Sequence, residues 1–260
     1  MRIIGSVGLV LFYGLIGLLL CYGIYYSTQK GFLGKEQLLF IFFLIFSYYY
    51  YLQIFSPNVK NFNSFLLSLP LVIGIGIWVL IYWNFKYADL NSNLLMLEFT
   101  LALLYGIPHQ YLNLRQIPFL KNVLVALVWV LMPWIFISFK DVNPLLVSLT
   151  MEVFVFIFLI SMRFDEIDYD VDLKSKHITA STILSKQHST FIILVGSSVM
   201  VILDVLMWKF LCLDRNKMVS QLLINVLLIY FLLGSVKGIR KYKITYDTIL
   251  LMKVVCLCLI

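Results

Sequence analysis

Long apolar runs recur along the whole of this 260-residue chain, and they constrain the fold more than any other feature. Each run has about 17–25 residues, which is enough for a helix to cross a hydrocarbon core about 30 Å thick. A transmembrane β-barrel would instead show alternating segments of about ten residues, and these runs are continuous. The sequence therefore predicts an all-α integral membrane protein with about nine transmembrane helices. The runs lie at roughly 3–26, 36–56, 63–85, 91–107, 119–138, 144–162, 189–213, 219–236 and 244–260.

The composition agrees with a chain that is surrounded by lipid. Hydrophobic residues make up 62% of the chain and charged residues 13%, whereas soluble domains carry roughly 25% charged residues. The net charge of +7 does not indicate nucleic acid, because Lys and Arg mostly flank the apolar runs, where they set topology and contact anionic lipid headgroups. No linker divides the chain, so we expect a single polytopic membrane domain over residues 1–260 and no nucleic-acid partner.

The distribution of basic residues predicts the orientation. With a cytoplasmic N-terminus, more Lys and Arg residues fall in the inner loops than in the outer loops, which is the bias that cytoplasmic loops show. We therefore expect a multi-pass protein of the cell membrane whose N-terminus is cytoplasmic. The loops at 108–118, 163–188 and 237–243 then face the cytoplasm.

The segment RFDEIDYDVDLKSKH, residues 163–177, concentrates negative charge between two apolar runs. It holds Asp165, Glu166, Asp168, Asp170 and Asp172, out of 13 acidic residues in the chain. If the preceding helix continues through the segment, the carboxylates of Asp165, Asp168 and Asp172 share one face. Mg²⁺ prefers oxygen ligands and is often held by one or two carboxylates and a substrate phosphate. The segment is therefore a candidate seat for a Mg²⁺–diphosphate. The alternative is a solvated charged loop that helps to set topology.

Basic residues of the inner loops can serve the same chemistry. The acidic segment begins with Arg163 and ends with Lys174, Lys176 and His177. The loop PHQYLNLRQIPFLKN, residues 108–122, adds Tyr111, Arg115, Lys121 and Asn122. Cationic groups such as these can neutralise the oxygens of a diphosphate. The alternative is that these loops only set the topology and place a tyrosine at the interface.

Ionisable residues inside the apolar runs are few. We expect Glu98 and Glu152 at the outer interface, because they lie near the starts of their runs. Asp204 lies deeper, and an ionisable group at such depth is a functional candidate by default. Its alternative roles are a pairing with Lys209 or a local hydrogen bond. The last run is short and carries Lys253 in its middle.

Motifs of several other protein classes are absent from the sequence. The three histidines and four cysteines form neither HExxH nor CxxC, so we expect no zinc site and read the cysteines as small buried hydrophobes. Walker, Rossmann and GxSxG motifs are missing as well.

Two inner-loop motifs resemble those of the UbiA superfamily of intramembrane prenyltransferases. DEIDYDVDLKSKHIT is similar to the family's second acidic motif, a DxxxD that follows another Asp and precedes a Thr. The matching residues are Asp165, Asp168, Asp172 and Thr179. YLNLR resembles the family's YxxxK/R loop between the fourth and fifth helices. The matching residues are Tyr111, Arg115 and Asn122, which opens the fifth helix.

The resemblance implies a helical bundle whose central cavity opens to the cytoplasmic side. It also implies the Mg²⁺-dependent transfer of an isoprenoid chain from a prenyl diphosphate to a lipid-soluble acceptor, with membrane lipids as further partners. The implied metal ligands are Asp165, Asp168 and Asp172. The implied catalytic residues are Asp168, Asp172, Tyr111 and Arg115. The implied substrate-binding residues are Asn122, Lys174, Lys176 and Thr179.

The family's first acidic motif, NDxxDxxxD, has no counterpart after the second run. The corresponding stretch, YYYYLQIFSPNVKNFN, contains no acid, only the amides Gln53, Asn58, Asn61 and Asn63. Two alternatives to the prenyltransferase therefore stay open. One is a catalytically impaired relative with a lipid-binding or scaffold role. The other is a transporter that uses Asp204 and the acidic segment.

Overall fold

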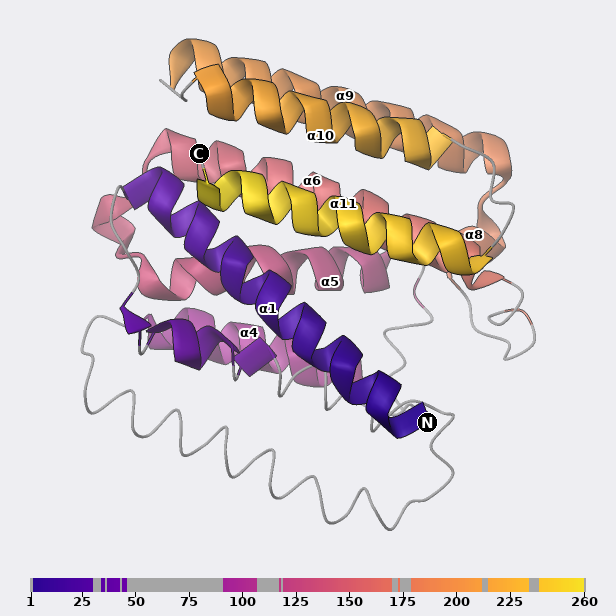
Figure 1. Cartoon of the computed structure of the whole chain (residues 1–260), viewed down its shortest axis with the longest axis horizontal. Helices are drawn as coiled ribbons and strands as arrows, with labels where there is room; N and C mark the ends of the chain where they lie inside the picture. Colours follow the sequence, from indigo (N-terminus) through magenta and orange to yellow (C-terminus); the bar gives the residue numbers. More distant parts are fainter. Residues whose placement is uncertain are drawn as a thin grey trace.

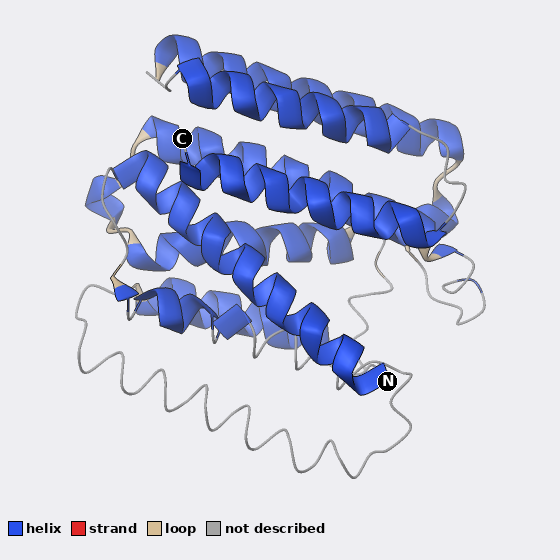
Figure 2. Cartoon of the chain, in the orientation of Figure 1, coloured by secondary structure: helices blue, strands red, loops and turns tan. Residues whose placement is uncertain are grey.

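The computed structural model shows a bundle of α-helices (Figure 1). It describes residues 2–29, 34–35, 37–42, 44–45, 91–106, 117, 119–169, 173, 179–211, 215–233 and 239–259. The long helices are α1 (Arg2–Gln29), α4 (Ser92–Gly106), α5 (Leu120–Leu131), α6 (Pro144–Ile167), α9 (Lys186–Phe210), α10 (Arg215–Leu233) and α11 (Ile239–Leu259). The shorter ones are η2 (Met132–Phe136), η3 (Phe139–Asp141) and α8 (Ala180–Ile183). Within the described residues there are helices and loops and no strand (Figure 2).

The helices have the length and apolar character of membrane spans, which confirms the predicted all-α membrane fold. In the described part of the chain, 3 helical stretches are long and apolar enough to cross a membrane: Leu11–Gln29, Pro144–Ile167 and Gln187–Phe210. Leu120–Phe136 and Met218–Leu233 are shorter apolar stretches. Most of the predicted span at 36–56 and all of that at 63–85 lie outside the described residues. The total of about nine spans therefore stays a prediction.

The predicted span at 119–138 contains a break. The α-helical part, α5, ends at Leu131, and the chain continues as the 3-10 helix η2 with Pro133 in its first turn. Proline has no N–H, and its ring clashes with the carbonyl one turn earlier, so α-helical hydrogen bonding cannot pass through it. The break lies at the end of the bundle opposite the acidic segment (Figure 1).

The start of α6 is set by two neighbouring residues. The side chain of Asn143 accepts a hydrogen bond from the N–H of Leu146 at 2.8 Å, which caps the helix. Pro144 follows in the first turn, where its missing N–H costs nothing. This confirms the start predicted at 144.

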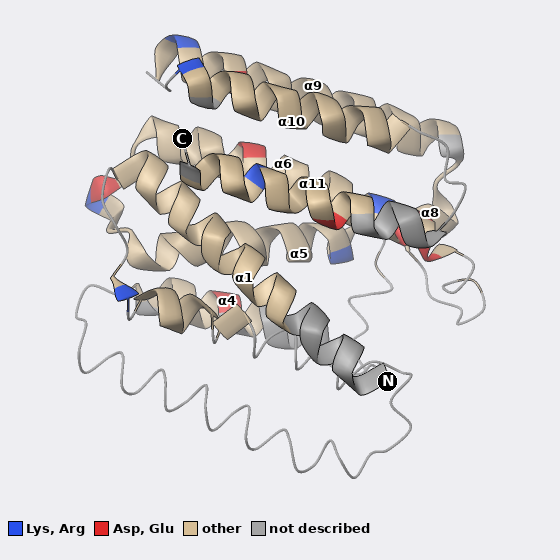
Figure 3. Ribbon diagram, viewed as in Figure 1, with Lys and Arg blue, Asp and Glu red and all other residues tan. Residues whose placement is uncertain are grey.

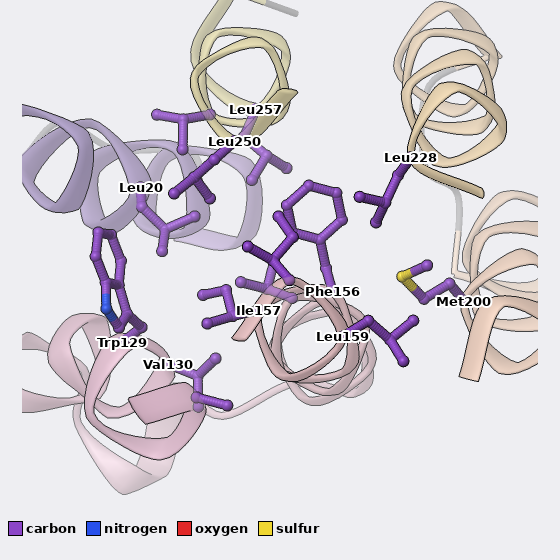
Figure 4. Close-up of a cluster of buried hydrophobic side chains, with 14 of the residues drawn as sticks. Leu20, Trp129, Val130, Phe156, Ile157, Leu159, Met200, Leu228, Leu250 and Leu257 are labelled. Atoms are coloured by element: carbon purple, nitrogen blue, oxygen red, sulfur yellow. The ribbon is translucent and has the colours of Figure 1, made fainter. Parts of the chain in front are cut away.

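The main apolar core surrounds α6. Figure 4 shows Phe156 and Leu159 of α6 on the side of Met200 and Leu228, which belong to α9 and α10, and Ile157 on the side that faces α1 and α5. Phe156 and Leu159 are fully buried. The remaining face of α6 is exposed at Val147 and Met151. In a membrane helix an exposed face meets lipid and is apolar too, which explains why the α6 run reads as continuously hydrophobic.

The first and last helices of the described chain lie side by side and run parallel (Figure 1). The Tyr13 hydroxyl donates to Asp247 Oδ1 at 3.0 Å near the middle of both helices. Gly23 approaches α11 so closely that an added Cβ would lie 2.8 Å from Leu257 Cβ and 3.1 Å from its backbone carbon. Small residues allow such close contact between membrane helices. A parallel first and last helix is also expected of a chain with an odd number of membrane crossings.

Replacing Gly23 by Leu should weaken the contact between α1 and α11. Overpacking of a tight contact costs typically about 1–3 kcal/mol, and here the clash includes backbone of the neighbouring helix. Thermal unfolding of the purified protein in detergent measures the loss. Gly34→Leu is the matched control, since a Cβ at Gly34 would meet only Gln37 Oε1 at 3.6 Å. Equal stability of the two variants would show that the helices do not approach as described.

Candidate functional site

One end of the bundle gathers the residues that the sequence indicated. The C-terminal ends of α6 and α10 meet there with α8 and the N-terminal ends of α5, α9 and α11 (Figure 1). Figure 3 shows basic residues in blue and acidic residues in red near this end, on helices α5, α6 and α11. We call it the site end of the bundle.

α6 brings part of the acidic segment into the helical bundle. It extends past the predicted end at 162 to Ile167, which places Asp165 within the helix. Asp168 is the C-cap, with φ −89° and ψ 5°, so α6 itself does not continue through the segment, which was the condition for a shared carboxylate face; Asp172 lies outside the described residues. Successive carboxylates at the negative end of the helix dipole disfavour its continuation.

Asp165 joins the last turns of α6 to the first turn of α5. Its carboxylate is buried, with 1% exposure, and forms an ion pair through Oδ1 with Lys121. Asn122 Nδ2 donates to Asp165 Oδ2 at 3.1 Å and to Ser161 Oγ at 3.0 Å. The chain enters α5 through Phe119, whose left-handed φ of 64° is unusual for an aromatic residue. Two helices are thus fixed to each other by one carboxylate.

A second polar network ties α6 to the three C-terminal helices. Glu166 accepts hydrogen bonds from Arg163 of α6 and from Ser189 of α9. Arg163 Nε donates to the Tyr246 hydroxyl of α11 at 3.2 Å, and this hydroxyl donates to the Phe231 carbonyl of α10 at 3.0 Å. The charge of Arg163, which the sequence offered for diphosphate binding, is therefore matched within the protein by Glu166.

Thr179 begins the short helix α8, which packs against the end of α6. Its backbone N–H donates to Thr182 Oγ1 at 2.9 Å in a capping box. Its hydroxyl lies 3.0 Å from Ser181 Oγ, which in turn donates to the backbone carbonyl of Asp165 at 2.9 Å. Thr179 is buried. The predicted substrate-binding threonine is thus part of the framework around Asp165.

The structure brings together some of the predicted site residues. Asp165, Asn122 and Thr179 share one polar cluster, and the partly exposed Asp168 lies at the adjoining end of α6. The other predicted residues lie outside the described residues: Tyr111, Arg115, Asp172, Lys174 and Lys176. Among the residues that the structure describes, no three His, Cys, Asp or Glu side chains come close enough to hold a metal. A metal site that includes Asp172 therefore stays a prediction.

The pairing of Asp165 with Lys121 was not predicted from the sequence. The two residues are 44 positions apart, so no local spacing reveals their contact. The resemblance to the UbiA motifs indicated Asp165 and Asn122 separately, as a metal ligand and a substrate-binding residue.

The carboxyl groups inside the membrane helices are buried, and the interfacial position expected for Glu98 and Glu152 is wrong. Their exposures are 2% and 0%, and that of Asp204 is 0%. Glu152 forms an ion pair with Lys253 of α11. Asp204 does not follow the predicted pairing with Lys209, since it bonds to an amide of α10. Position along an apolar run does not show which helix face a residue occupies.

The arrangement of the helices is similar to that in solved structures of a UbiA homolog from Archaeoglobus fulgidus. The structure bound to Cd²⁺ gives a TM-score of 0.57 at 14% identity and covers 95% of this chain and 98% of that one. The structure bound to GPP and Mg²⁺ gives 0.55 at 15% identity, with coverages of 96% and 99%. The structure bound to DMAPP and Mg²⁺ gives 0.52 at 15% identity, also with coverages of 96% and 99%.

These likenesses confirm the predicted UbiA-like fold over nearly the whole chain. No protein-family model matches the sequence, and no curated protein matches it.

Replacing Lys121 by Met should destabilise the fold, because it leaves the buried Asp165 without its cation. Breaking a fully buried pair costs about 3–5 kcal/mol. We expect roughly 1–3 kcal/mol here, since the Lys121 side chain is 26% exposed. Thermal unfolding in detergent measures the change, with Lys121→Arg as the control that keeps the charge.

A double variant separates the ion pair from other effects of the lysine. Adding Asp165→Asn to Lys121→Met removes the unpaired charge and should restore part of the lost stability. If the double variant is less stable than Lys121→Met by the full effect of Asp165→Asn alone, the two side chains are not coupled.

Proposed function

We propose that this protein is a Mg²⁺-dependent intramembrane prenyltransferase, which moves an isoprenoid chain from a prenyl diphosphate to a lipid-soluble acceptor. The observation that carries the proposal is its fold likeness, over 95–96% of the chain, to UbiA homolog structures that include complexes with GPP or DMAPP and Mg²⁺. The acidic segment that resembles the family's second motif starts within the last turn of α6, at the site end.

We assign the metal to Asp168 and Asp172. Asp168 is partly exposed at the end of α6, and Asp172 follows it by four residues in the sequence. Carboxylate oxygens are the donor type that Mg²⁺ prefers, so this pair of residues fits the ion. Bound Mg²⁺ would stabilise the negative charge that develops on a leaving diphosphate.

We assign Asp165 a positioning role in place of the metal ligation that the resemblance implied. Both of its oxygens already accept hydrogen bonds, one from Lys121 and one from Asn122. Through these bonds Asp165 fixes the end of α6, and so the start of the segment that carries Asp168. Asn122 and Thr179 act on the site in the same indirect way, since both are buried in the framework around Asp165.

We assign the diphosphate to the basic residues of the inner loops. Arg115, Lys174 and Lys176 would neutralise its oxygens, and Tyr111 would donate a hydrogen bond to the leaving oxygen. The carbon–oxygen bond breaks with its electron pair on the diphosphate, and the acceptor attacks the allylic carbon and then loses a proton. The allylic carbon is positively charged between these two steps, and apolar helices keep water away from it until the acceptor attacks. We assign this site end, and the N-terminus, to the cytoplasmic side, which the positive-inside bias of the basic residues supports.

A catalytically impaired relative is the second candidate, and one observation favours it. No Asp or Glu lies between Glu36 and Asp89, where the family's first acidic motif would fall. Such a protein would keep the bundle and bind lipid or other membrane proteins without turnover.

Turnover in liposomes distinguishes the two candidates. Purified protein supplied with Mg²⁺, prenyl diphosphates of several chain lengths and a membrane lipid extract as the source of the acceptor should release diphosphate. Asp168→Asn and Asp172→Asn should each lower the rate roughly 100-fold or more, as expected for the loss of a group that stabilises transition-state charge. Asp141→Asn is the matched control, because Asp141 is an exposed residue of η3 at the opposite end of α6.

Binding is measured on the same samples. If the folded protein neither binds nor consumes any of these diphosphates, the enzyme proposal is overturned and the non-catalytic candidate is supported. Equal loss of activity in Asp141→Asn would remove the assignment of Asp168 and Asp172 to the metal.

A further inference from the structure

A second polar cluster lies inside the membrane, far from the site end. It consists of Glu152 of α6, Asp204 of α9, Asn225 of α10 and Lys253 of α11, each with 0% exposure. In Figure 3, a red segment of α6 and a blue segment of α11 mark its ion pair midway along the bundle. Glu152 precedes Asp165 by 13 residues on the same helix, which corresponds to about 20 Å. The cluster is therefore independent of the proposed enzyme site.

Asn225 links the charged groups of the cluster. Its Nδ2 donates to Glu152 Oε1 at 3.0 Å and to Asp204 Oδ2 at 2.6 Å. Lys253 Nζ donates to Glu152 Oε1 at 2.6 Å and to Asn225 Oδ1 at 3.3 Å. The same ammonium lies 5.4 Å from the centre of the Phe156 ring. Each of the four helices thus contributes one hydrogen-bonding group.

The charges of the cluster do not balance if both acids are ionised. Lys253 provides one positive charge and forms its ion pair with Glu152. Asp204 accepts a single hydrogen bond, from a neutral amide, and its Oδ1 is buried with no hydrogen-bond partner among the described residues, as is Glu152 Oε2. Among the described residues, the charged groups that act on Asp204 are Glu152 from α6 and Lys253 from α11, while its hydrogen-bond partner on α10 is the neutral Asn225. A second cation is therefore missing from the described surroundings of Asp204.

An unpaired carboxylate is very costly in such surroundings. Moving an isolated ionised carboxylate into an apolar interior is so unfavourable that the group takes up a proton instead. In a membrane helix the cost is high enough that ionisable side chains almost always find a partner. A proton on Asp204 removes the excess charge and also supplies an O–H donor where the cluster has two unsatisfied oxygens.

We propose that Glu152, Asp204, Asn225 and Lys253 form an intramembrane proton-binding site in which Asp204 holds the proton. The proton belongs to Asp204 because Glu152 accepts hydrogen bonds from both the ammonium and the amide, which stabilise its charged form. Loss of the proton places two carboxylates against one ammonium. The excess negative charge loosens the packing of α9 and α10 against α6 and α11. The packing of the hairpin formed by α9 and α10 therefore depends on pH.

Infrared spectroscopy of the protein in liposomes detects the proton directly. The wild-type protein should show the carbonyl stretch of a buried protonated carboxylic acid at neutral pH. Asp204→Asn, which imitates the neutral acid, should lose this band. Asp141→Asn is the matched control, because it makes the same chemical change at an exposed acid and should keep the band. Glu152→Gln tests the charge balance: it leaves Asp204 as the one carboxylate of the cluster beside Lys253, so Asp204 should ionise and its band should weaken.

Glu98 is buried too, and neither of its oxygens has a hydrogen-bond partner among the described residues, so it can add a band of its own. The readout is therefore the difference between the spectra of wild type and Asp204→Asn, and a difference spectrum without the band overturns the proposal.

Stability as a function of pH gives a second, independent readout. The folded state holds a proton that the unfolded chain releases into water, so unfolding releases a proton and raising the pH favours it. The melting temperature of the wild-type protein should therefore fall from mildly acidic to mildly alkaline pH, and that of Asp204→Asn should fall less. Asp204→Asn should be as stable as wild type at the acidic end, because it replaces a neutral group by a neutral group.

The outcomes remain decisive if Glu152→Gln fails to fold, since wild type and Asp204→Asn already form a complete comparison at each pH. A marked destabilisation of Asp204→Asn at acidic pH shows that the charged carboxylate is required and overturns the proposal. So does a wild-type stability that responds to Na⁺ or K⁺ at constant ionic strength while ignoring pH, because a metal cation would then occupy the place of the proton.

Discussion

In a bundle surrounded by lipid, each buried polar group must find its partner inside the protein, and this constraint acts most strongly on α6. Near one end of this helix, Asp165 accepts hydrogen bonds from Lys121 and Asn122 of α5. Midway, Glu152 accepts hydrogen bonds from helices α10 and α11. The apolar side chains between these points fill the core. Polar contacts thus fix the rotation and register of α6, and its neighbours are arranged around it.

Much of this architecture is readable in the sequence because it depends on local properties. Length and continuous hydropathy predict the spans. The pair Asn143–Pro144 marks the start of α6, since the amide caps the helix and the proline follows in the first turn. The end of α6 was harder to predict, because Arg163 and Asp165 read as the start of a charged loop. They are helical because their charges are matched, that of Asp165 by Lys121 of α5 and that of Arg163 by Glu166 of α6 itself.

Contacts between distant residues account for what the sequence did not predict. Lys253 and Glu152 are 101 positions apart, so no spacing rule connects the lysine in the last run with the acid in the sixth. For the candidate site, the resemblance to known motifs identified Asp165, Asn122 and Thr179, which do meet in space. It did not identify their arrangement. The carboxylate of Asp165, which the resemblance implied as a metal ligand, is paired with Lys121, which reaches it from the first turn of α5.

The pairing of Lys253 also bears on how the protein is made. Synthesis proceeds from the N-terminus, so α11 enters the membrane after α6 and α10. A lysine at the centre of an isolated helix costs about 2.5–3.5 kcal/mol on insertion. Glu152 and Asn225 are already in place when Lys253 arrives. α11 therefore inserts where its hydrogen-bond partners are already present, and it then packs against α1, the first helix of the described chain.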